Sequence, residues 1–175
     1  MNTALVEIVE LSADDVRAAA GELAQLLLDA HASNMSLGLP GPLSRERAVE
    51  AWIDTAARLD PQNRVLLAAV DGGEVVGTVQ VVRAESENGR ARAEIVRLAV
   101  RGDRRGSGLG RRLLEAAVER ARRLDLRLLW LTTHADTDSD RFYEAAGWTR
   151  LGVLPAYSTR PDGTLAGAAL FYREV

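Results

Sequence analysis

The 175-residue sequence predicts an α/β (α+β) fold: a mixed sheet of about seven strands with about four helices on its faces. Three observations support this prediction. Apolar residues recur at helical spacing in the first third of the chain, alternate with a period of two after position 64, and return to helical spacing after position 108. The composition, 47% apolar and 27% charged, is sufficient for one sizeable core. The length fits a single domain over residues 1–175.

The first third of the chain predicts one short strand and two helices. The apolar run Leu5–Val9 indicates the strand. Helical spacing follows over Ser12–His31, where Ser12 and Asp15 have the spacing of a capping box. A second helix is expected over Ser44–Asp60. The intervening segment Met35–Leu43 contains Pro-Gly-Pro and is a candidate lid.

The remainder of the chain predicts six strands and two helices. A two-glycine turn after Asp71 indicates a hairpin, and a long apolar face indicates an amphipathic helix after the middle strands. The expected strands are Val65–Val70, Val75–Val82, Ala93–Val100, Arg127–Thr132, Trp148–Leu154 and Leu165–Tyr172. The expected helices are Gly108–Leu124 and Asp138–Ala146, and a turn over Tyr157–Gly163 joins the last two strands.

Composition argues against several kinds of site and partner. The chain has no cysteine, and all 22 basic residues are arginine, which removes thiolate, Schiff-base and Walker-lysine chemistry. Two histidines are too few for a histidine zinc cluster, so no metal is expected. The net charge of −3 argues against a nucleic-acid partner. Without a signal peptide or an apolar membrane span, we expect a cytoplasmic monomer or homodimer with no membrane partner.

A glycine-rich turn follows the expected strand at 93–100 and opens directly into a helix, with the sequence Gly106-Ser107-Gly108-Leu109-Gly110-Arg111. Glycines let a ligand approach the backbone, and the unpaired amides at a helix start attract anions. Residues 97–127 contain ten arginines against four acids. The pattern predicts a phosphate or pyrophosphate site; the alternative is a helix start with a solvated basic face.

The spacing of this turn differs from that of a dinucleotide site. Its glycines follow G-x-G-x-G rather than G-x-G-x-x-G, and the next strand ends in Leu131-Thr132-Thr133 without an acid for a ribose. A nucleotide-binding protein is therefore disfavoured.

Two motifs resemble those of the GNAT family of N-acetyltransferases. The turn, Arg105-x-x-Gly108-x-Gly110 after Leu98-Ala99-Val100, is similar to the family's coenzyme-A motif Q/R-x-x-G-x-G/A. Phe142-Tyr143 followed by Gly147-Trp148 resembles the element A-x-x-x-Y-x-x-x-G-F, with Ser139 in place of the usual alanine. The order of elements fits the family over nearly the whole chain. C-terminal segments resemble the branch that includes tabtoxin-resistance acetyltransferase, namely Leu154-Pro155-x-Tyr157, Pro161-Asp162-Gly163 and Phe171-Tyr172.

The resemblance implies a mostly antiparallel sheet and acetyl-CoA as co-substrate. It further implies that the pantetheine arm pairs with the motif strand, that the turn amides hold the pyrophosphate, and that this strand splays from the one at 127–132 to form the acyl-binding notch. The implied coenzyme-binding residues are Leu98, Ala99, Val100, Arg105, Gly106, Ser107, Gly108, Leu109, Gly110 and Arg111.

Acyl transfer to an amine requires a group that takes the amine proton, because an alkylammonium has a pKa of about 10.4. Glu94 is the candidate base. It lies near the start of the motif strand, where alternation places it on the same side as Val96, Leu98 and Val100. The alternative is an ion pair with a neighbouring arginine, Arg92 or Arg97.

The leaving thiolate requires a hydrogen-bond donor. Tyr143 matches the position of the family's tyrosine and is the candidate donor; the alternative is packing beside Phe142 in the core. Weaker candidates for the acceptor pocket are His134, which is also a possible second base, Asp136 and Tyr157.

These residues favour an acetyl-CoA-dependent N-acetyltransferase that acts on a primary amine of a small molecule. Direct attack in a ternary complex is expected, because no acyl-cysteine can form. The alternatives are a protein or peptide N-acetyltransferase and a non-catalytic acyl-CoA-binding sensor.

Overall fold

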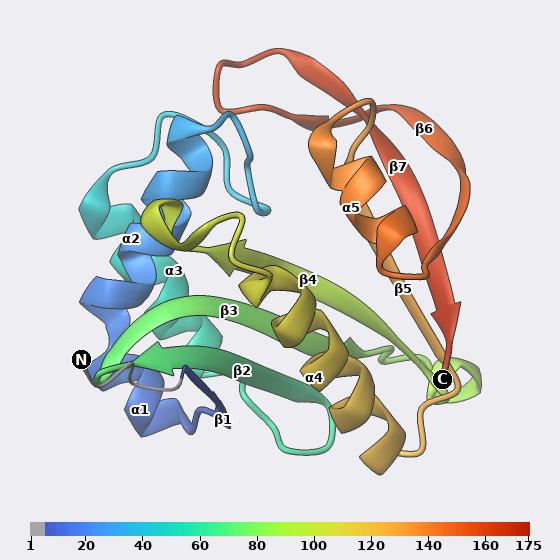
Figure 1. Ribbon diagram of the computed structural model, residues 1–175, viewed down its shortest axis with the longest axis horizontal. Helices are drawn as coiled ribbons and strands as arrows, with labels where there is room; N and C mark the ends of the chain where they lie inside the picture. The colour runs from blue at the N-terminus through green and yellow to red at the C-terminus, as the bar shows by residue number, and fades with distance from the viewer. Residues whose placement is uncertain (1–5) are drawn as a thin grey trace.

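The computed structural model describes residues 6–175, which form one seven-stranded sheet in the order β1-β2-β3-β4-β5-β7-β6 (Figure 1). Neighbouring strands are antiparallel except β4 and β5, which are parallel. The strands are β1 (Glu7–Glu10), β2 (Arg64–Asp71), β3 (Glu74–Arg83), β4 (Arg92–Val100), β5 (Leu128–His134), β6 (Thr149–Thr159) and β7 (Leu165–Glu174). The predicted α+β class, mixed sheet and strand count are confirmed; Leu5 of the first expected strand lies outside the described residues.

Helices cover both faces of the sheet. The described residues contain five α-helices, namely α1 (Ala13–Ala18), α2 (Ala20–Ala32), α3 (Arg45–Ala56), α4 (Leu109–Arg123) and α5 (Asp138–Ala145). Helices α1 to α3 pack on one face, whereas α4 and α5 pack on the other. No helix within residues 6–175 is both long and apolar enough to cross a membrane.

Alternating residues of the central strands supply both cores. In β2, Val65 and Leu67 face α4, whereas Leu66 and Ala68 face α1 to α3. Because both faces are covered, nearly every residue of β2 and β3 is buried. A fully buried side chain such as Leu113 of α4 contributes about 1.5–3 kcal/mol to stability through burial alone.

The first predicted helix is divided in the structure. Ser12 and Asp15 form the expected capping box at the start of α1. At Ala19, however, the backbone leaves helical geometry (φ −90°, ψ 7°) and α2 begins at the next residue. The apolar spacing continues across this break because both helices pack on the same core, so the pattern did not reveal the break. The structure therefore has five α-helices where about four were expected.

Strand β6 is longer than predicted. It continues from Leu154 to Thr159, through residues expected to form a turn. The register with β7 shifts between Leu154 and Ser158, and Ala156 has a left-handed φ of +49°. This irregularity interrupts the alternation of side chains, which explains why a period-two pattern did not extend there.

A β-bulge at Arg97 determines where the side chains of β4 point. The register with β3 shifts there, and Arg97 has a φ of +51°. As a result, Ile95 before the bulge and both Leu98 and Val100 after it pack toward α4. The expectation that Glu94 shares a side with Leu98 and Val100 is therefore wrong, because the additional residue of the bulge reverses the alternation. Glu94 lies on the face covered by α1 to α3.

Candidate active site

Strands β4 and β5 separate soon after they pair. Their pairing covers only Arg92–Glu94 and Leu128–Trp130. Beyond it β4 stays with β3 as far as Val100, whereas β5 follows β7 as far as His134. Figure 1 shows the two strands diverging. From Ile95 onward, the edge of β4 that faces β5 has no strand partner among residues 6–175, so backbone groups of β4 are available to a ligand.

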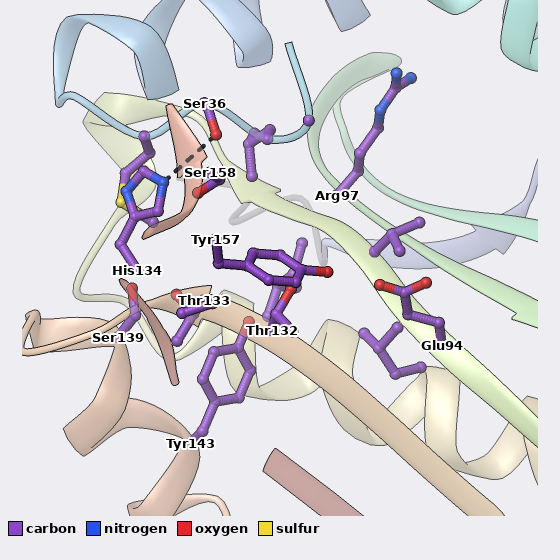
Figure 2. A pocket seen from close by; sticks show the side chains of 17 residues that line it. Ser36, Glu94, Arg97, Thr132, Thr133, His134, Ser139, Tyr143, Tyr157 and Ser158 are labelled. Carbon is purple, nitrogen blue, oxygen red and sulfur yellow. Dashed lines mark hydrogen bonds between the residues drawn. The ribbon is translucent and has the colours of Figure 1, made fainter. Parts of the chain in front are cut away.

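A cavity of about 370 Å³ occupies this separation, within the usual size range of small-ligand sites. Its wall is formed by β4, by β5, by the loop after α2 and by the tip of the β6–β7 hairpin. The polar side chains around it include Ser36, Glu94, His134, Tyr143 and Tyr157 (Figure 2). Four residues that the sequence singled out are therefore brought to one cavity from four different elements.

Glu94 contributes a carboxyl group with no ion-pair or hydrogen-bond partner within residues 6–175, so the alternative pairing with Arg92 or Arg97 is not formed. The side chain is half-buried. Burial raises the pKa of Glu94 above its usual value, and the guanidinium of Arg64 offsets part of this rise. A carboxylate with a raised pKa and free lone pairs is suited to accepting a proton.

Tyr143 packs in the core and also reaches the cavity, so its position is compatible with both interpretations that the sequence left open. Its ring packs in the core against Phe142, Trp148 and Phe171, with centroid distances of 5.1, 6.3 and 5.5 Å. The residue also lines the cavity, toward which its hydroxyl group points in Figure 2. Burial raises the pKa of Tyr143, so the hydroxyl group stays protonated and can donate a hydrogen bond.

His134 and Tyr157 complete the polar part of the wall. His134 is buried at the end of β5, with Nε2 3.5 Å from the Ser36 hydroxyl oxygen, while Nδ1 has no partner within residues 6–175. Burial, followed by the charge of Arg160, lowers the pKa of His134, which favours the neutral imidazole. Tyr157 is 49% exposed, and its ring lies across the cavity with the hydroxyl group directed toward Glu94 (Figure 2).

Asp136 is not brought to the cavity. It lies in the turn before α5 with a φ of +60°, and its backbone amide donates to the Asp140 carboxylate at 3.0 Å. With Asp138 and Asp140 it lines a separate shallow depression. Over residues 6–175, no group of three or more acidic or histidine side chains is arranged to hold a metal ion.

A second groove leads from the cavity to Arg105, the residue before the glycine turn. It measures about 430 Å³, and Met35, Leu37, Leu98 and Ser139 line both spaces. Its other walls include Ala99, Val100 and Arg105 of the implied coenzyme-binding set. The groove and the cavity thus lie side by side along β4, from Arg105 to Glu94.

At the glycine turn, the backbone that leads into α4 is not covered by side chains of residues 6–175. Gly106 and Gly108 have left-handed φ values of +75° and +81°, which glycine adopts without strain. Gly108 is the N-cap residue of α4, and no side chain caps the first turn. A Cβ atom at Gly108 would have no atom within 4 Å. The first-turn amides therefore face open space in which an anion can bind.

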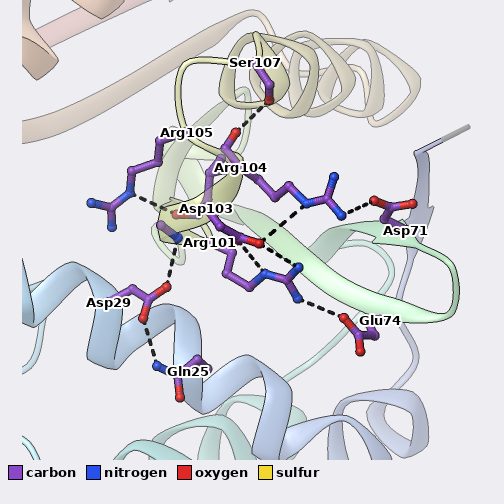
Figure 3. Close-up of polar contacts among 11 residues, drawn as sticks. Gln25, Asp29, Asp71, Glu74, Arg101, Asp103, Arg104, Arg105 and Ser107 are labelled. Carbon is purple, nitrogen blue, oxygen red and sulfur yellow. Dashed lines mark hydrogen bonds and ion pairs between the residues drawn. The ribbon is translucent and has the colours of Figure 1, made fainter. Parts of the chain in front are cut away.

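Most arginines near this turn are already engaged by the protein (Figure 3). Arg101 pairs with Asp103 and Glu74, and Arg104 pairs with Asp71 at 2.7 Å. Arg105 donates to the Ser33 hydroxyl at 2.7 Å and to the Val100 carbonyl at 3.2 Å, which ties the turn to the end of α2. Arg112 donates to the Val6 carbonyl.

Arg111 differs from these neighbours. It is exposed in the first turn of α4 and has no hydrogen bond or ion pair to any residue from 6 to 175. Of the arginines around the turn, it is therefore the side chain with most capacity left for a phosphate group.

Replacing Gly108 with valine should weaken acetyl-CoA binding at least tenfold. The side chain would enter the space beside the helix amides, and its backbone would be strained by about 1–2 kcal/mol. Gly73→Val is the matched control, because Gly73 also has a left-handed φ (+90°) and open surroundings but lies in the β2–β3 turn. Calorimetry should show reduced affinity only for Gly108→Val. Equal affinities for the two variants would contradict an anion site at this turn.

Acetyl-CoA binding should also weaken as salt rises, since part of the attraction is between exposed charges and phosphates. Arg111→Ala should reduce the slope of log Kd against log salt. Arg123→Ala, at the far end of the same helix and paired there with Glu119, should leave the slope unchanged. Titrations at several salt concentrations check this; the same slope in all three proteins would remove Arg111 from the site.

Known proteins are similar to this chain in sequence and in fold. Residues 24–148 match the sequence profile of the acetyltransferase (GNAT) family. A mycothiol acetyltransferase from Propionibacterium freudenreichii is 31% identical over 122 residues, which are 67% of this chain and 36% of that protein. This chain thus spans about a third of the length of that relative.

Solved structures share the fold at lower identity. A ribosomal-protein-alanine N-acetyltransferase from Brucella melitensis has a TM-score of 0.77 at 21% identity, over 97% of this chain and 99% of that chain. A phosphinothricin acetyltransferase from Sinorhizobium meliloti in complex with AcCoA has a TM-score of 0.75 at 17% identity, over 97% of this chain and 88% of that chain. One of these proteins is named for a protein substrate and the other for phosphinothricin, so the shared fold alone does not identify an acceptor.

Proposed function

Because this chain belongs to the acetyltransferase (GNAT) family, a family of acetyl-CoA-dependent enzymes, we propose that residues 1–175 form one acyltransferase domain that acetylates a primary amine of a small molecule. Family membership confirms the resemblance seen in the motifs; assignment to the tabtoxin-resistance branch stays a prediction. The observation that carries the proposal is the cavity between β4 and β5, where an unpaired carboxyl group and a protonated phenol meet.

The glycine turn supports acetyl-CoA as the donor. Backbone amides at the start of α4 and the side chain of Arg111 suit its phosphates, and the groove along Leu98–Val100 suits its extended arm. Bound there, acetyl-CoA would supply an acyl thioester. Its thiol end would point into the cavity that contains Glu94.

Two side chains have separate roles, one as proton acceptor and one as hydrogen-bond donor. Glu94 accepts a proton from the acceptor ammonium, directly or through one water, and so provides the free amine for attack on the thioester carbon. Tyr143 donates a hydrogen bond to the sulfur as it leaves. Because the chain has no cysteine to carry the acyl group, the amine attacks the thioester directly in a ternary complex.

The cover of the cavity favours a small acceptor over a polypeptide. The Tyr157 ring lies across the cavity, and loop residues Met35 to Gly38 form another wall. A protein side chain or N-terminus would require an open groove for the residues on either side of it. A cavity of about 370 Å³ with these side chains around it suits a free small molecule.

A thiol-release assay tests the proposal. Purified protein is mixed with acetyl-CoA and a panel of amino acids, polyamines, aminoglycosides and peptides. We expect thiol release with at least one small amine and an intersecting initial-velocity pattern, as a ternary complex requires. Turnover of peptides alone would support the protein-directed alternative. Binding of acetyl-CoA without turnover of any amine would support the sensor.

A further inference from the structure

Two arginines and a glutamine form a polar cluster on the sheet face that carries Glu94. Arg64 of β2 and Glu94 of β4 lie in one cross-strand row, because both are in register with Val82 of β3. Gln80 lies in the adjacent row on the same face, beside Val96 of the cavity wall. Arg97, at the bulge, turns toward the same side and contacts α3.

Arg97 is a desolvated cation without an acid partner. It donates to the Thr55 hydroxyl at 2.8 Å and to the Ala51 carbonyl at 3.4 Å, and it lies 5.1 Å from the centroid of the Trp52 ring. None of these contacts neutralises its charge, and no acid within residues 6–175 is within ion-pair distance. Burial lowers the pKa of Arg97 to about 10, with a further contribution from Arg64. A half-buried guanidinium without an acid partner is stabilised when an anion binds to it.

Arg64 adds a second guanidinium group, beside Gln80. Arg64 donates to Gln80 Oε1 at 3.2 Å, and it too has no acid partner within ion-pair distance among the described residues. Gln80 is fully buried, yet its Nε2 has no partner anywhere in residues 6–175. Gln80 is too deeply buried to reach a ligand, but by accepting from Arg64 it holds that guanidinium on the face that carries Glu94.

These charges are arranged to suit an acceptor that carries both an amine and an acid. Glu94 and Arg97 both line the cavity, where Glu94 offers a carboxylate to an ammonium group and Arg97 offers a guanidinium group on the α3 side. Arg64, behind the cavity lining, adds positive charge to the same face. Among the side chains drawn in Figure 2, Arg97 and Tyr143 lie at opposite ends, and Tyr157 lies between them. An acceptor whose amine lies beside Glu94 can therefore extend away from Tyr143 toward Arg97. The left-handed φ of Arg97 agrees with a functional role, since strained residues persist where function requires them.

We propose that the acceptor is an amine that also bears a carboxylate, and that this carboxylate binds to Arg97, with the guanidinium of Arg64 contributing a second positive charge on the same face. The proposal rests on the proposed function and specifies its substrate class. Guanidinium groups bind planar carboxylates through paired hydrogen bonds, which a simple alkylamine or a polyamine would leave unmade.

Matched acceptors test the proposal by thiol release. β-Alanine is compared with propylamine, and 4-aminobutanoate with butylamine, because each pair differs only in the carboxylate. We expect kcat/KM to favour the amino acid by about ten- to a hundredfold, the amount expected for a charged hydrogen-bonded group. Arg97→Gln should abolish this preference through KM, Arg64→Gln should weaken it, and both should leave acetyl-CoA affinity unchanged. The matched control is Arg58→Gln, an exposed arginine nearby, which should retain the preference. Equal use of the two acceptors, or a preference for the alkylamine, would overturn the proposal.

A binding measurement separates this site from catalysis and keeps the test valid if none of these amines reacts. Butanoate and butanamide are titrated into the CoA-loaded protein, and binding is followed by NMR chemical shifts. Butanoate should bind more tightly to the wild type but not to Arg97→Gln, with Arg97→Lys intermediate. Such binding without turnover of any amine would remove the proposed activity and retain the carboxylate site. Equal binding of the acid and the amide would overturn the site even in an active enzyme.

Discussion

Glu94→Gln should lower turnover at neutral pH by about 10²–10⁴-fold, as is typical when a general base is lost. Glutamine keeps the shape of glutamate but cannot accept the proton of an ammonium acceptor. The defect should shrink toward pH 10, where free amine already exists in solution. The comparison uses kcat/KM from thiol release between pH 6 and 10. Full turnover of the variant at neutral pH would remove Glu94 from the mechanism and leave His134 or a water as the base.

The melting temperature of Glu94→Gln gives a second test, independent of turnover, of whether Glu94 is unpaired in the folded protein. Burial raises the pKa of Glu94 in the folded state. The folded protein therefore holds this proton more tightly than the unfolded chain, and the contribution of Glu94 to stability decreases as pH rises through the window between the two pKa values. Removing the charge should leave the melting temperature at pH 7 unchanged or higher. The control Glu85→Gln removes an exposed charge outside the cavity and should change neither turnover nor melting.

Local sequence patterns were sufficient for most of the fold. The β2–β3 hairpin follows from alternating apolar residues around two glycines, and α4 follows from one apolar face. What the pattern missed depends on long-range pairing. The bulge at Arg97 exists only relative to β3, and the continuation of β6 beyond Leu154 exists only relative to β7. The sequence of one strand alone reveals neither feature, because each is defined by the register with a second strand.

In the candidate site, too, local sequence patterns predicted some features, whereas others depend on long-range contacts. Glu94, Tyr143, His134 and Tyr157 meet because β4 and β5 diverge, which the family resemblance implied and the residues alone did not. The basic turn was expected to offer its arginines to phosphates. In the structure, however, carboxylates distant in the sequence occupy several of them, such as Asp71 on Arg104. Net charge along a segment could not reveal these partners.

Arg97 was considered only as a partner for Glu94. An arginine within an otherwise apolar strand segment was the available signal, but its meaning depends on α3, more than forty residues earlier in the chain. Thr55 and Trp52 of that helix hold the guanidinium away from Glu94. The ion pair with Glu94, which the sequence left open as an alternative, is therefore not formed, and among residues 6–175 Arg97 has no acid partner.

Tyr143→Phe should lower kcat by about ten- to a hundredfold, the loss expected when one hydrogen bond to a developing charge is removed. Affinity for acetyl-CoA should change little, because the ring and its packing on Phe142 and Phe171 remain. Tyr172→Phe is the matched control: it removes a phenol hydroxyl from β7, outside the cavity lining. Thiol release and calorimetry on both variants check the separation of kcat from binding.

The pH dependence distinguishes a hydrogen-bond donor from a titrating acid. Burial raises the pKa of Tyr143, so its hydroxyl group stays protonated across the working range and donates at every pH tested. The defect of Tyr143→Phe should therefore be constant between pH 6 and 10, whereas the defect of Glu94→Gln falls. A Tyr143→Phe defect that vanished above pH 9 would mean that the phenol ionises during turnover, which its buried ring packing opposes. A variant with full kcat would leave the thiolate to be stabilised by backbone amides of β4, where the edge facing β5 has no strand partner.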